Sequence, residues 1–205
     1  MDKAFDEVLA RYLARMRDEE PAMADAQRAG FDPDKYLLAV GEEVARVLHA
    51  LIVARRAKHI LELGTSYGFS TLFLADAARR TGGKVVTMDV AADKQDYARR
   101  QLADAKLDGF VDFQAGNALD LLVQAEGPIE FVLLDLWKDL YVPCFEAFRS
   151  KLAPNAIVAA DNMLYPEIAR ADAERYQAAV RADSDFQSML LPIGSGIELS
   201  CRGRK

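Results

Sequence analysis

From Lys58 onward, short apolar runs alternate with amphipathic segments, and this alternation restricts the possible folds more than any other feature of the sequence. The apolar runs read HILEL, KVVTMD, VDFQ, IEFVLLD and AIVAAD, and the amphipathic segments lie near residues 69–80, 92–106, 117–125 and 140–152. Strands that alternate with helices form βαβ units, in which helices cover both faces of a parallel sheet. We therefore expect an α/β protein with a mostly parallel sheet.

The two ends of the chain add helices before this sheet and a hairpin after it. Helical spacing predicts helices over about 3–17, 20–29 and 34–54, with Asp32-Pro33-Asp34 as the start of the third. A helix near 166–182 precedes apolar runs near 186–192 and 196–201, which Gly194-Ser195-Gly196 separates as a hairpin turn. We expect a single domain over residues 1–205, with a helical extension over 1–55 and a seven-stranded core over 56–205.

Charge and composition exclude several kinds of partner. The formal net charge of −6 at pH 7 argues against a surface for nucleic acid or an anionic membrane, because such partners need a basic patch. Glu42, Glu43 and Arg46 interrupt the most apolar stretch, so no membrane span is predicted, and nothing at the N-terminus resembles a targeting signal. We expect a cytoplasmic protein that acts on a small molecule.

Cysteine and histidine are too sparse to suggest a soft-metal site. Cys144 and Cys201 are far apart and form no CxxC pattern, so neither a disulfide framework nor a thiolate zinc site is predicted. His49 lies in an apolar helical stretch and His59 opens a strand, and we interpret both as structural. A metal ion in this protein would therefore be bound by oxygen atoms.

A glycine-containing turn follows the first strand of the core. That strand ends in Glu62-Leu63-Gly64, and a helix begins near Gly68, where the absence of a side chain permits unusual backbone angles and close approach of a ligand. Open parallel sheets bind ligands at the carboxyl ends of their strands. The next strand ends in Asp89, about 20 residues beyond Gly68, where an acid accepts hydrogen bonds from ribose hydroxyls. The pattern indicates a nucleoside-binding turn.

Two classes of cofactor compete for this turn. A dinucleotide requires GxGxxG so that backbone amides can hold a pyrophosphate, whereas this chain has E-x-G-x-x-x-G. Glu62 would repel a pyrophosphate but suits a ligand that carries an ammonium and a sulfonium group, and Ser70 is placed to bond the carboxylate of that ligand. The sequence therefore favours S-adenosylmethionine over NAD, and a tight turn without any ligand is the remaining alternative.

Oxygen-bearing side chains follow the fourth and fifth predicted strands. Asp135 ends one strand and the pair Asp161-Asn162 ends the next, so the three side chains are expected at the same sheet edge as the cofactor. Two carboxylates and a carboxamide suit Mg²⁺ or Ca²⁺ rather than zinc or copper. Each of these residues alone is also typical of a helix cap or a turn. Lys138 and Trp137, taken singly, are typical of a solvated loop and of a packed core.

The segments LLDLWKDLYVP and VAADNMLYP resemble the metal-binding and catalytic segments of the catechol and caffeoyl-CoA O-methyltransferases. The segments ILELGTSYGFST and VVTMD resemble the cofactor segments of the same family, in the same order and at similar separations. The resemblance extends from about Val40 to Cys201. It implies a class I methyltransferase fold, which is Rossmann-like, with a seven-stranded, mostly parallel sheet that ends in an antiparallel hairpin.

The resemblance also assigns roles to individual residues. Asp135, Asp161 and Asn162 would bind Mg²⁺ or another hard divalent cation, and Lys138 would be the general base. Trp137 and Pro166 would flank a flat substrate. The cofactor-binding residues would be Glu62, Gly64, Gly68, Ser70, Asp89, Ala118 and Asp135.

The sequence departs from the family pattern in three places. Leu136 stands where the animal catechol enzyme has a histidine, no residue matches the glutamate that holds the second catechol hydroxyl, and the N-terminal helices carry no motif of the family. We expect a Mg²⁺-dependent O-methyltransferase for a catechol-like or other small phenolic acceptor, with the helical N-terminus as a candidate homodimer interface. The alternatives are a non-catalytic or metal-independent protein that binds S-adenosylmethionine, and an NAD-dependent oxidoreductase.

Overall fold

The computed structural model describes residues 1–29 and 35–203. The helix start predicted at Asp32-Pro33-Asp34 therefore lies outside the described residues. The helices are α1 (Lys3–Ala29), α2 (Glu42–Arg55), α3 (Phe69–Thr81), α4 (Ala92–Asp104), α5 (Ala118–Gln124), α6 (Tyr141–Phe148) and α7 (Arg170–Ala182). The strands are β1 (His59–Leu63), β2 (Lys84–Asp89), β3 (Val111–Ala115), β4 (Ile129–Leu134), β5 (Leu152–Ala160), β6 (Phe186–Leu191) and β7 (Ile197–Arg202).

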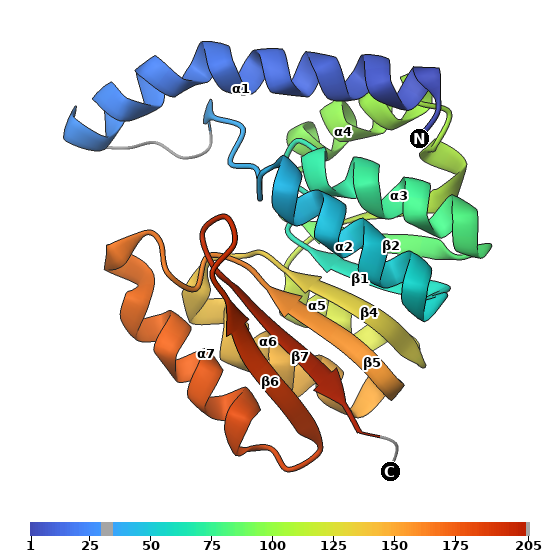
Figure 1. The fold of residues 1–205 in the computed structure, drawn as a ribbon, viewed down its shortest axis with the longest axis vertical. Coiled ribbons are helices and arrows are strands. Elements are labelled where there is room, and N and C mark those ends of the chain that lie inside the picture. Colours follow the sequence, from blue (N-terminus) through green and yellow to red (C-terminus); the bar gives the residue numbers. More distant parts are fainter. Residues whose placement is uncertain (30–34, 204–205) are drawn as a thin grey trace.

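The strands in the described ranges form one seven-stranded sheet in the order β3-β2-β1-β4-β5-β7-β6 (Figure 1). Strands β1 to β5 are parallel, and β7 runs antiparallel to both β5 and β6. The predicted parallel sheet with a C-terminal antiparallel hairpin is therefore confirmed. The strand order changes direction beside β1 and β4, and ligands of open parallel sheets bind at such a point.

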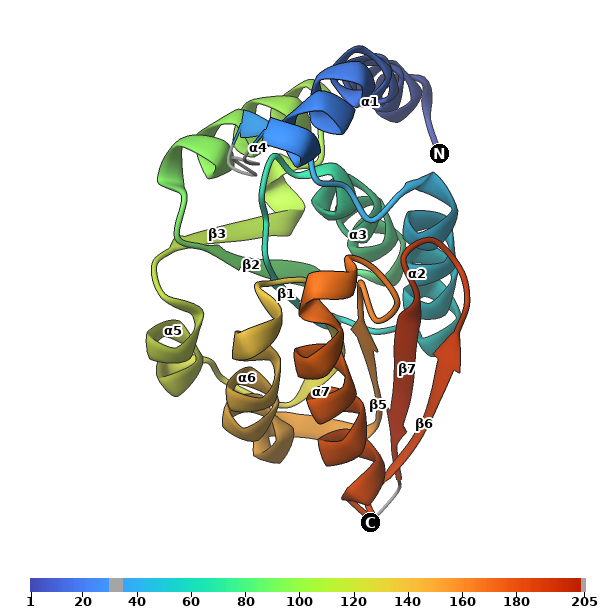
Figure 2. The ribbon, with the colours of Figure 1, turned by 90° about the vertical axis from the view of Figure 1, so that its left-hand side faces the viewer.

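Helices cover both faces of the sheet, as the alternating pattern predicts. Helices α2 and α3 pack on one face and α5, α6 and α7 on the other, which Figure 2 shows from the side. The central strands are buried on both faces; Phe131, Val132, Leu133 and Leu134 of β4 have no exposed surface. Helix α1 lies outside this sandwich, over α3 and α4 (Figure 1).

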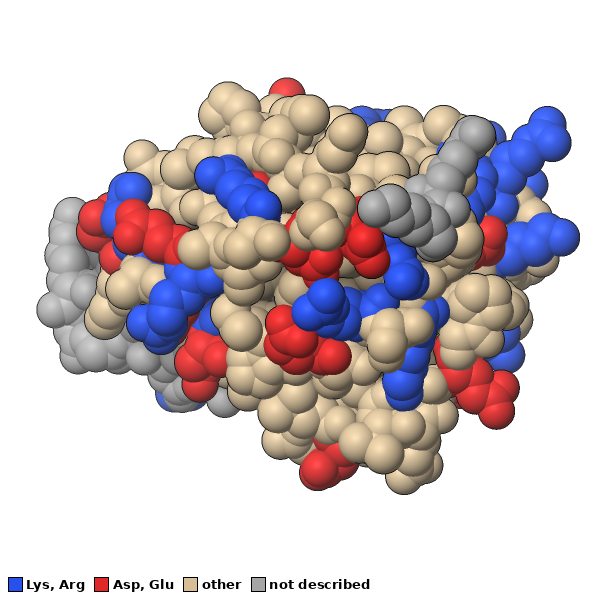
Figure 3. Space-filling view, turned by 90° about the horizontal axis from the view of Figure 1, so that it is seen from below, with Lys and Arg blue, Asp and Glu red and all other residues tan. Residues whose placement is uncertain are grey.

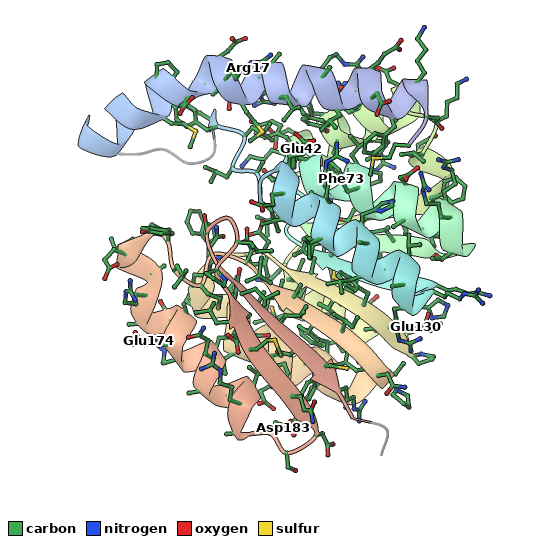
Figure 4. All side chains as sticks on the ribbon, in the orientation of Figure 1. Arg17, Glu42, Phe73, Glu130, Glu174 and Asp183 are labelled. Atoms are coloured by element: carbon green, nitrogen blue, oxygen red, sulfur yellow. The ribbon has the colours of Figure 1, made fainter. Side chains whose placement is uncertain are left out.

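The structure corrects the predicted helices near the N-terminus at two points. Residues 3–29 form one helix through Pro21, where two helices were expected. Proline removes one backbone hydrogen bond, but Arg17, whose carbonyl would have accepted it, lies on the exposed side of α1, where water can take its place (Figure 4). Helix α2 begins at Glu42 rather than at residue 34, because Gly41 has φ 86°, which a helix does not accommodate.

The later elements differ from the prediction only at their ends. Helix α6 ends at Phe148, and β5 begins at Leu152, four residues before the predicted run AIVAAD. No helix in the described residues is long and apolar enough to cross a membrane. On the face seen in Figure 3, the described basic and acidic side chains are interspersed rather than gathered into patches of one sign.

Candidate active site

The turn between β1 and α3 has a backbone that glycine makes possible. Gly64 has φ 102° and Gly68 has φ 86°. A Cβ atom at Gly64 would collide with the carbonyl oxygen of Asp135, and one at Gly68 would lie 2.5 Å from the Cβ of Ala98. Ser66, between them, also has a positive φ of 45°. The turn therefore approaches β4 and α4 more closely than side chains would allow.

Glu62 lies beneath this turn and is completely buried. Its carboxylate accepts hydrogen bonds from Ser70 Oγ (2.6 Å), Thr71 Oγ1 (2.6 Å) and Thr87 Oγ1 (2.7 Å). Burial raises the pKa of Glu62 to about 7, although the three hydroxyl groups act in the opposite direction. The hydroxyl of Ser70 thus donates its hydrogen bond to Glu62. The sequence had instead suggested that Ser70 binds the carboxylate of a ligand.

Sequence reasoning missed Thr71 and Thr87, which complete the hydroxyl cage of Glu62. Both carried a signal. Thr71 directly follows Ser70, and Thr87 is the one hydroxyl residue of the strand run KVVTMD. A polar side chain that a strand buries needs a partner, and a buried acid on the neighbouring strand provides one, since Glu62 pairs with Thr87 in the β1–β2 register.

Asp89 and Ala118 lie beside the turn at the same edge of the sheet. Asp89 ends β2 and accepts hydrogen bonds from the backbone amides of Ser66 (2.7 Å) and Ala91 (2.8 Å). Ala118 is buried at the start of α5, directly after the N-cap Asn117. Asp89 thus fixes the far side of the turn, and each carboxylate oxygen keeps a second lone pair for a ligand.

The acids predicted to bind a metal meet at the ends of β4 and β5. The amide of Asp135 donates to the carbonyl of Leu63 (2.9 Å), and the amide of Asp161 donates to that of Leu134 (3.0 Å). These hydrogen bonds extend the sheet by one residue per strand and bring the two carboxylates to one edge. Burial raises the pKa of both acids, that of Asp161 to about 8, and the charge of Asp135 adds to the effect on Asp161.

Lys138 lies among these acids with 7% of its side chain exposed. Its ammonium group donates to Leu136 O (2.9 Å), Tyr141 Oη (2.6 Å) and Asn162 Oδ1 (2.9 Å), and Nζ lies 3.9 Å from Asp135 Oδ1. Burial lowers the pKa of Lys138, while the nearby acids oppose that change. The lysine is therefore held in a fixed position in a poorly solvated environment.

Tyr141 is a second residue that sequence reasoning missed. It is completely buried, accepts the hydrogen bond of Lys138 and donates one to the carbonyl of Asp161 (3.2 Å). Its spacing gave a signal, because a residue three positions after Lys138 lies one helical turn away. Tyr141 therefore links the segment after β4 to the segment after β5.

The acids fit a hard divalent cation, although the described residues include no group of three or more His, Cys, Asp or Glu side chains that could bind one. Asp135 and Asp161 provide two carboxylates, and Asn162 provides an amide oxygen. Within the described part of the chain, Asp161 Oδ1 is buried without a hydrogen-bond partner. A buried, unpartnered carboxylate oxygen is costly unless a proton or a cation compensates it.

Trp137 and Pro166, the predicted substrate-flanking residues, are exposed beside these acids. Trp137 follows β4 with 62% of its surface exposed, and Pro166 follows β5. The only tryptophan of the chain is therefore not core packing. Tyr165 and Ile168 are exposed as well, so the loop after β5 presents apolar surface at the same sheet edge.

The profile of the family described as O-methyltransferase matches residues 15–203 of this chain. A probable O-methyltransferase of Mycobacterium tuberculosis is 33% identical over 190 residues, which are 87% of this chain and 77% of the relative. The catechol O-methyltransferase of the same organism is 31% identical over 147 residues, 71% of this chain and 66% of the relative. Caffeoyl-CoA O-methyltransferase 2 of Populus trichocarpa is 26% identical over 187 residues, 81% of this chain and 75% of the relative.

Solved structures agree with the fold. The O-methyltransferase TomG of Streptomyces achromogenes, in complex with SAM, has a TM-score of 0.77 at 24% identity and covers 99% of this chain, which covers 91% of it. The O-methyltransferase of Bacillus cereus, in complex with SAH, has the same TM-score at 24% identity, with coverage of 98% and 91%. The resemblance to the catechol and caffeoyl-CoA enzymes is confirmed, as is the class I methyltransferase fold.

Proposed function

Because the chain belongs to the O-methyltransferase family, we propose that it transfers the methyl group of S-adenosylmethionine to a hydroxyl of a catechol-like or other small phenolic acceptor, with Mg²⁺ or another hard divalent cation bound beside the acceptor. The observation that carries the proposal is the contact between the two halves of the site. Gly64 of the cofactor turn packs directly on the carbonyl of Asp135, which stands next to Lys138 and Asp161.

The cofactor turn suits a cationic nucleoside. The buried carboxylate of Glu62 beneath the turn favours a ligand with positive charge, and no GxGxxG pattern is present for a pyrophosphate. Asp89 keeps lone pairs for ribose hydroxyls, and Ala118 provides an apolar surface beside it. These features favour S-adenosylmethionine over NAD, the alternative that the sequence left open.

Asp135, Asp161 and Asn162 would hold the cation. A divalent cation bound there would favour the phenolate form of the acceptor and orient two adjacent oxygen atoms. The unpartnered oxygen of Asp161 supports this assignment, because a cation would give this buried carboxylate oxygen a positively charged partner. Among the described residues, the ammonium group of Lys138 forms an ion pair with Asp135, at 3.9 Å between Nζ and Oδ1.

Lys138 would remove the proton from the acceptor hydroxyl. A phenol with a pKa of about 10 is almost wholly protonated at pH 7, so the acceptor oxygen has to lose its proton as it attacks. Nζ can accept that proton only as a neutral amine, and burial favours this form by lowering the pKa of Lys138. A neutral amine has two N–H groups, so it can keep two of its three present hydrogen bonds while its lone pair faces the acceptor.

The loop residues would position the acceptor ring. Trp137 and Pro166 present exposed apolar surface in the loops after β4 and β5, the same loops that carry Lys138 and Asp161. Burying a flat ring between such surfaces excludes water, and holding the hydroxyl in line with the methyl group can supply about 7–11 kcal/mol of the barrier. We further propose that the protein acts on a small molecule rather than on nucleic acid or a membrane. We also propose that the chain forms a homodimer.

A screen of phenolic acceptors with labelled S-adenosylmethionine tests the proposal. We expect methyl transfer to vicinal dihydroxyaromatic compounds in the presence of Mg²⁺, and its loss in excess EDTA with recovery when Mg²⁺ is restored. Calorimetric titration should show binding of S-adenosylhomocysteine and none of NAD. Full transfer in excess EDTA would contradict the metal assignment, and binding of S-adenosylhomocysteine without transfer to any phenol would favour a non-catalytic protein.

A further inference from the structure

Helix α1 reaches the cofactor turn through a buried tyrosine. Tyr12 is 1% exposed, and its hydroxyl donates a hydrogen bond of 2.6 Å to the carbonyl of Tyr67, a residue 55 positions further along the chain. The same hydroxyl would lie 3.2 Å from a Cβ atom at Gly68. The helix that lies outside the sandwich in Figure 1 thus contacts the backbone of the turn itself.

Arg15, one turn further along α1, adds a second contact. Its guanidinium carbon lies 3.9 Å from the ring centroid of Tyr67 and 5.1 Å from that of Tyr97 on α4. Arg15 Nε donates to Glu19 Oε1 (2.6 Å), and Glu19 Oε2 accepts the amide of Leu37 (2.6 Å). Arg15 and Glu19 are mostly buried, with 22% and 19% of their side chains exposed.

The turn depends on contacts of this kind because its own backbone is unfavourable. Ser66 has φ 45°, in the left-handed region that residues with a Cβ avoid. Asp89 holds the amide of Ser66 on one side of the turn, and Tyr12 holds the carbonyl of Tyr67 on the other. The peptide units Thr65–Ser66 and Tyr67–Gly68 are therefore fixed by groups on β2 and α1, respectively.

We propose that Tyr12 and Arg15 are positioning residues for the cofactor turn, so that α1 sets the affinity of the protein for the methyl donor. Tyr12 fixes the carbonyl of Tyr67, and Arg15 fixes its ring. The inference rests on the proposed function only in assigning S-adenosylmethionine to the turn.

The test compares single substitutions in the full-length protein by calorimetric titration with S-adenosylhomocysteine. Tyr12→Phe removes one hydroxyl and keeps the ring, and we expect the Kd to rise about 3- to 10-fold, as for the loss of one buried hydrogen bond. Arg15→Gln should raise the Kd about 2- to 4-fold. With a phenol that the wild-type protein methylates, the KM for S-adenosylmethionine should rise in parallel, while kcat and the KM for the phenol stay within twofold.

Two control variants separate positioning from general packing. Tyr176→Phe removes the hydroxyl of a fully buried tyrosine on α7, across the sheet from α1, and should leave the Kd unchanged. Phe5→Leu loosens the packing of α1 on Phe73, at 5.1 Å between ring centroids, without touching the turn, and should lower the melting temperature while the Kd rises less than twofold. An equal loss of affinity in Phe5→Leu and Tyr12→Phe would overturn the proposal, because it would show a role in packing alone.

The outcomes also separate this proposal from the proposed function. A wild-type protein that binds S-adenosylhomocysteine, together with a folded Tyr12→Phe variant whose Kd is within twofold of the wild type, would overturn the positioning role alone. A wild-type protein that binds no S-adenosylhomocysteine would overturn the proposed donor and the positioning role with it.

Discussion

Glu62 on β1 and Asp161 after β5 are both almost fully buried acids at the same edge of the sheet, with β4 between their strands, but their surroundings differ. Three hydroxyl groups donate to Glu62, whereas one oxygen of Asp161 has no partner among the described residues. The cofactor half of the site is therefore complete as protein alone. In the metal half, Asp161 has this unpartnered oxygen and a pKa raised to about 8, so a bound cation would favour its charged form. The two halves should therefore respond differently to loss of a carboxylate.

The sharpest test of this difference is Asp161→Asn. We expect methyl transfer to fall by at least about 100-fold, because the variant loses a charged ligand of the proposed cation. In the absence of metal, the free energy of unfolding should rise by on the order of 1–3 kcal/mol at neutral pH, because folding of the variant no longer has to protonate a buried carboxyl whose pKa is raised to about 8. Chemical denaturation in EDTA and a methyl-transfer assay in Mg²⁺ measure the two effects.

Asp139→Asn is the matched control, since Asp139 is exposed in the loop after β4 and lies one residue from Lys138. It should change neither activity nor stability measurably. Loss of stability in Asp161→Asn would contradict the view that this carboxylate is uncompensated.

Substitution of Lys138 should give the next largest effect. Lys138→Met removes the proposed base and keeps an unbranched side chain, so kcat should fall about 100-fold or more. The Kd of S-adenosylhomocysteine should stay within twofold, because Lys138 contacts the segments after β4 and β5 rather than the turn. Lys138→Arg should not restore activity, because a guanidinium group stays protonated. Restored turnover in the arginine variant would indicate a purely electrostatic role.

Glu62 should determine how stability depends on pH. Its pKa of about 7 in the folded protein exceeds the ordinary value of 4.5, so its contribution is fully present below pH 4.5 and is lost as the pH rises through 7. At 1.36 kcal/mol per unit, the wild-type protein should lose about 3 kcal/mol over this window through Glu62. The comparison is urea denaturation at pH 5 and pH 8 of the wild type and Glu62→Gln, without cofactor. An equal pH dependence in the two proteins would show that the hydroxyl cage fully offsets burial.

The sequence predicted the parts of this site that depend on local pattern. Strands β1 and β2 have the predicted bounds, because their apolar runs are compact and flanked by charges or glycine. The meeting of Asp135 with Asp161 follows from their positions at the ends of adjacent parallel strands. These inferences need only periodicity and the geometry of a parallel sheet.

The parts that the sequence did not predict depend on contacts between distant residues. Tyr12 and Tyr67 are 55 positions apart, and Glu62 and Thr87 are 25 apart, so no local spacing indicates their hydrogen bonds. The continuous helix through Pro21 was missed for a different reason. Proline is a strong local signal for a helix end, but it removes a single backbone hydrogen bond, and on the exposed side of α1 water can replace that partner.

The smallest effect should come from substitution of Trp137, which lies in the loop after β4, in the metal half of the site where the acceptor is proposed to bind. Because 62% of its surface is exposed, Trp137→Ala should change the free energy of unfolding by less than about 0.5 kcal/mol. The KM for the phenolic acceptor should rise about 3- to 10-fold through loss of the ring contact, while the Kd of S-adenosylhomocysteine stays unchanged. Trp137→Phe should restore most of the acceptor affinity, since it returns an aromatic surface. A Trp137→Ala variant that lost affinity for S-adenosylhomocysteine instead would show that Trp137 contributes to the cofactor half. It would contradict the separation of the cofactor half from the metal half.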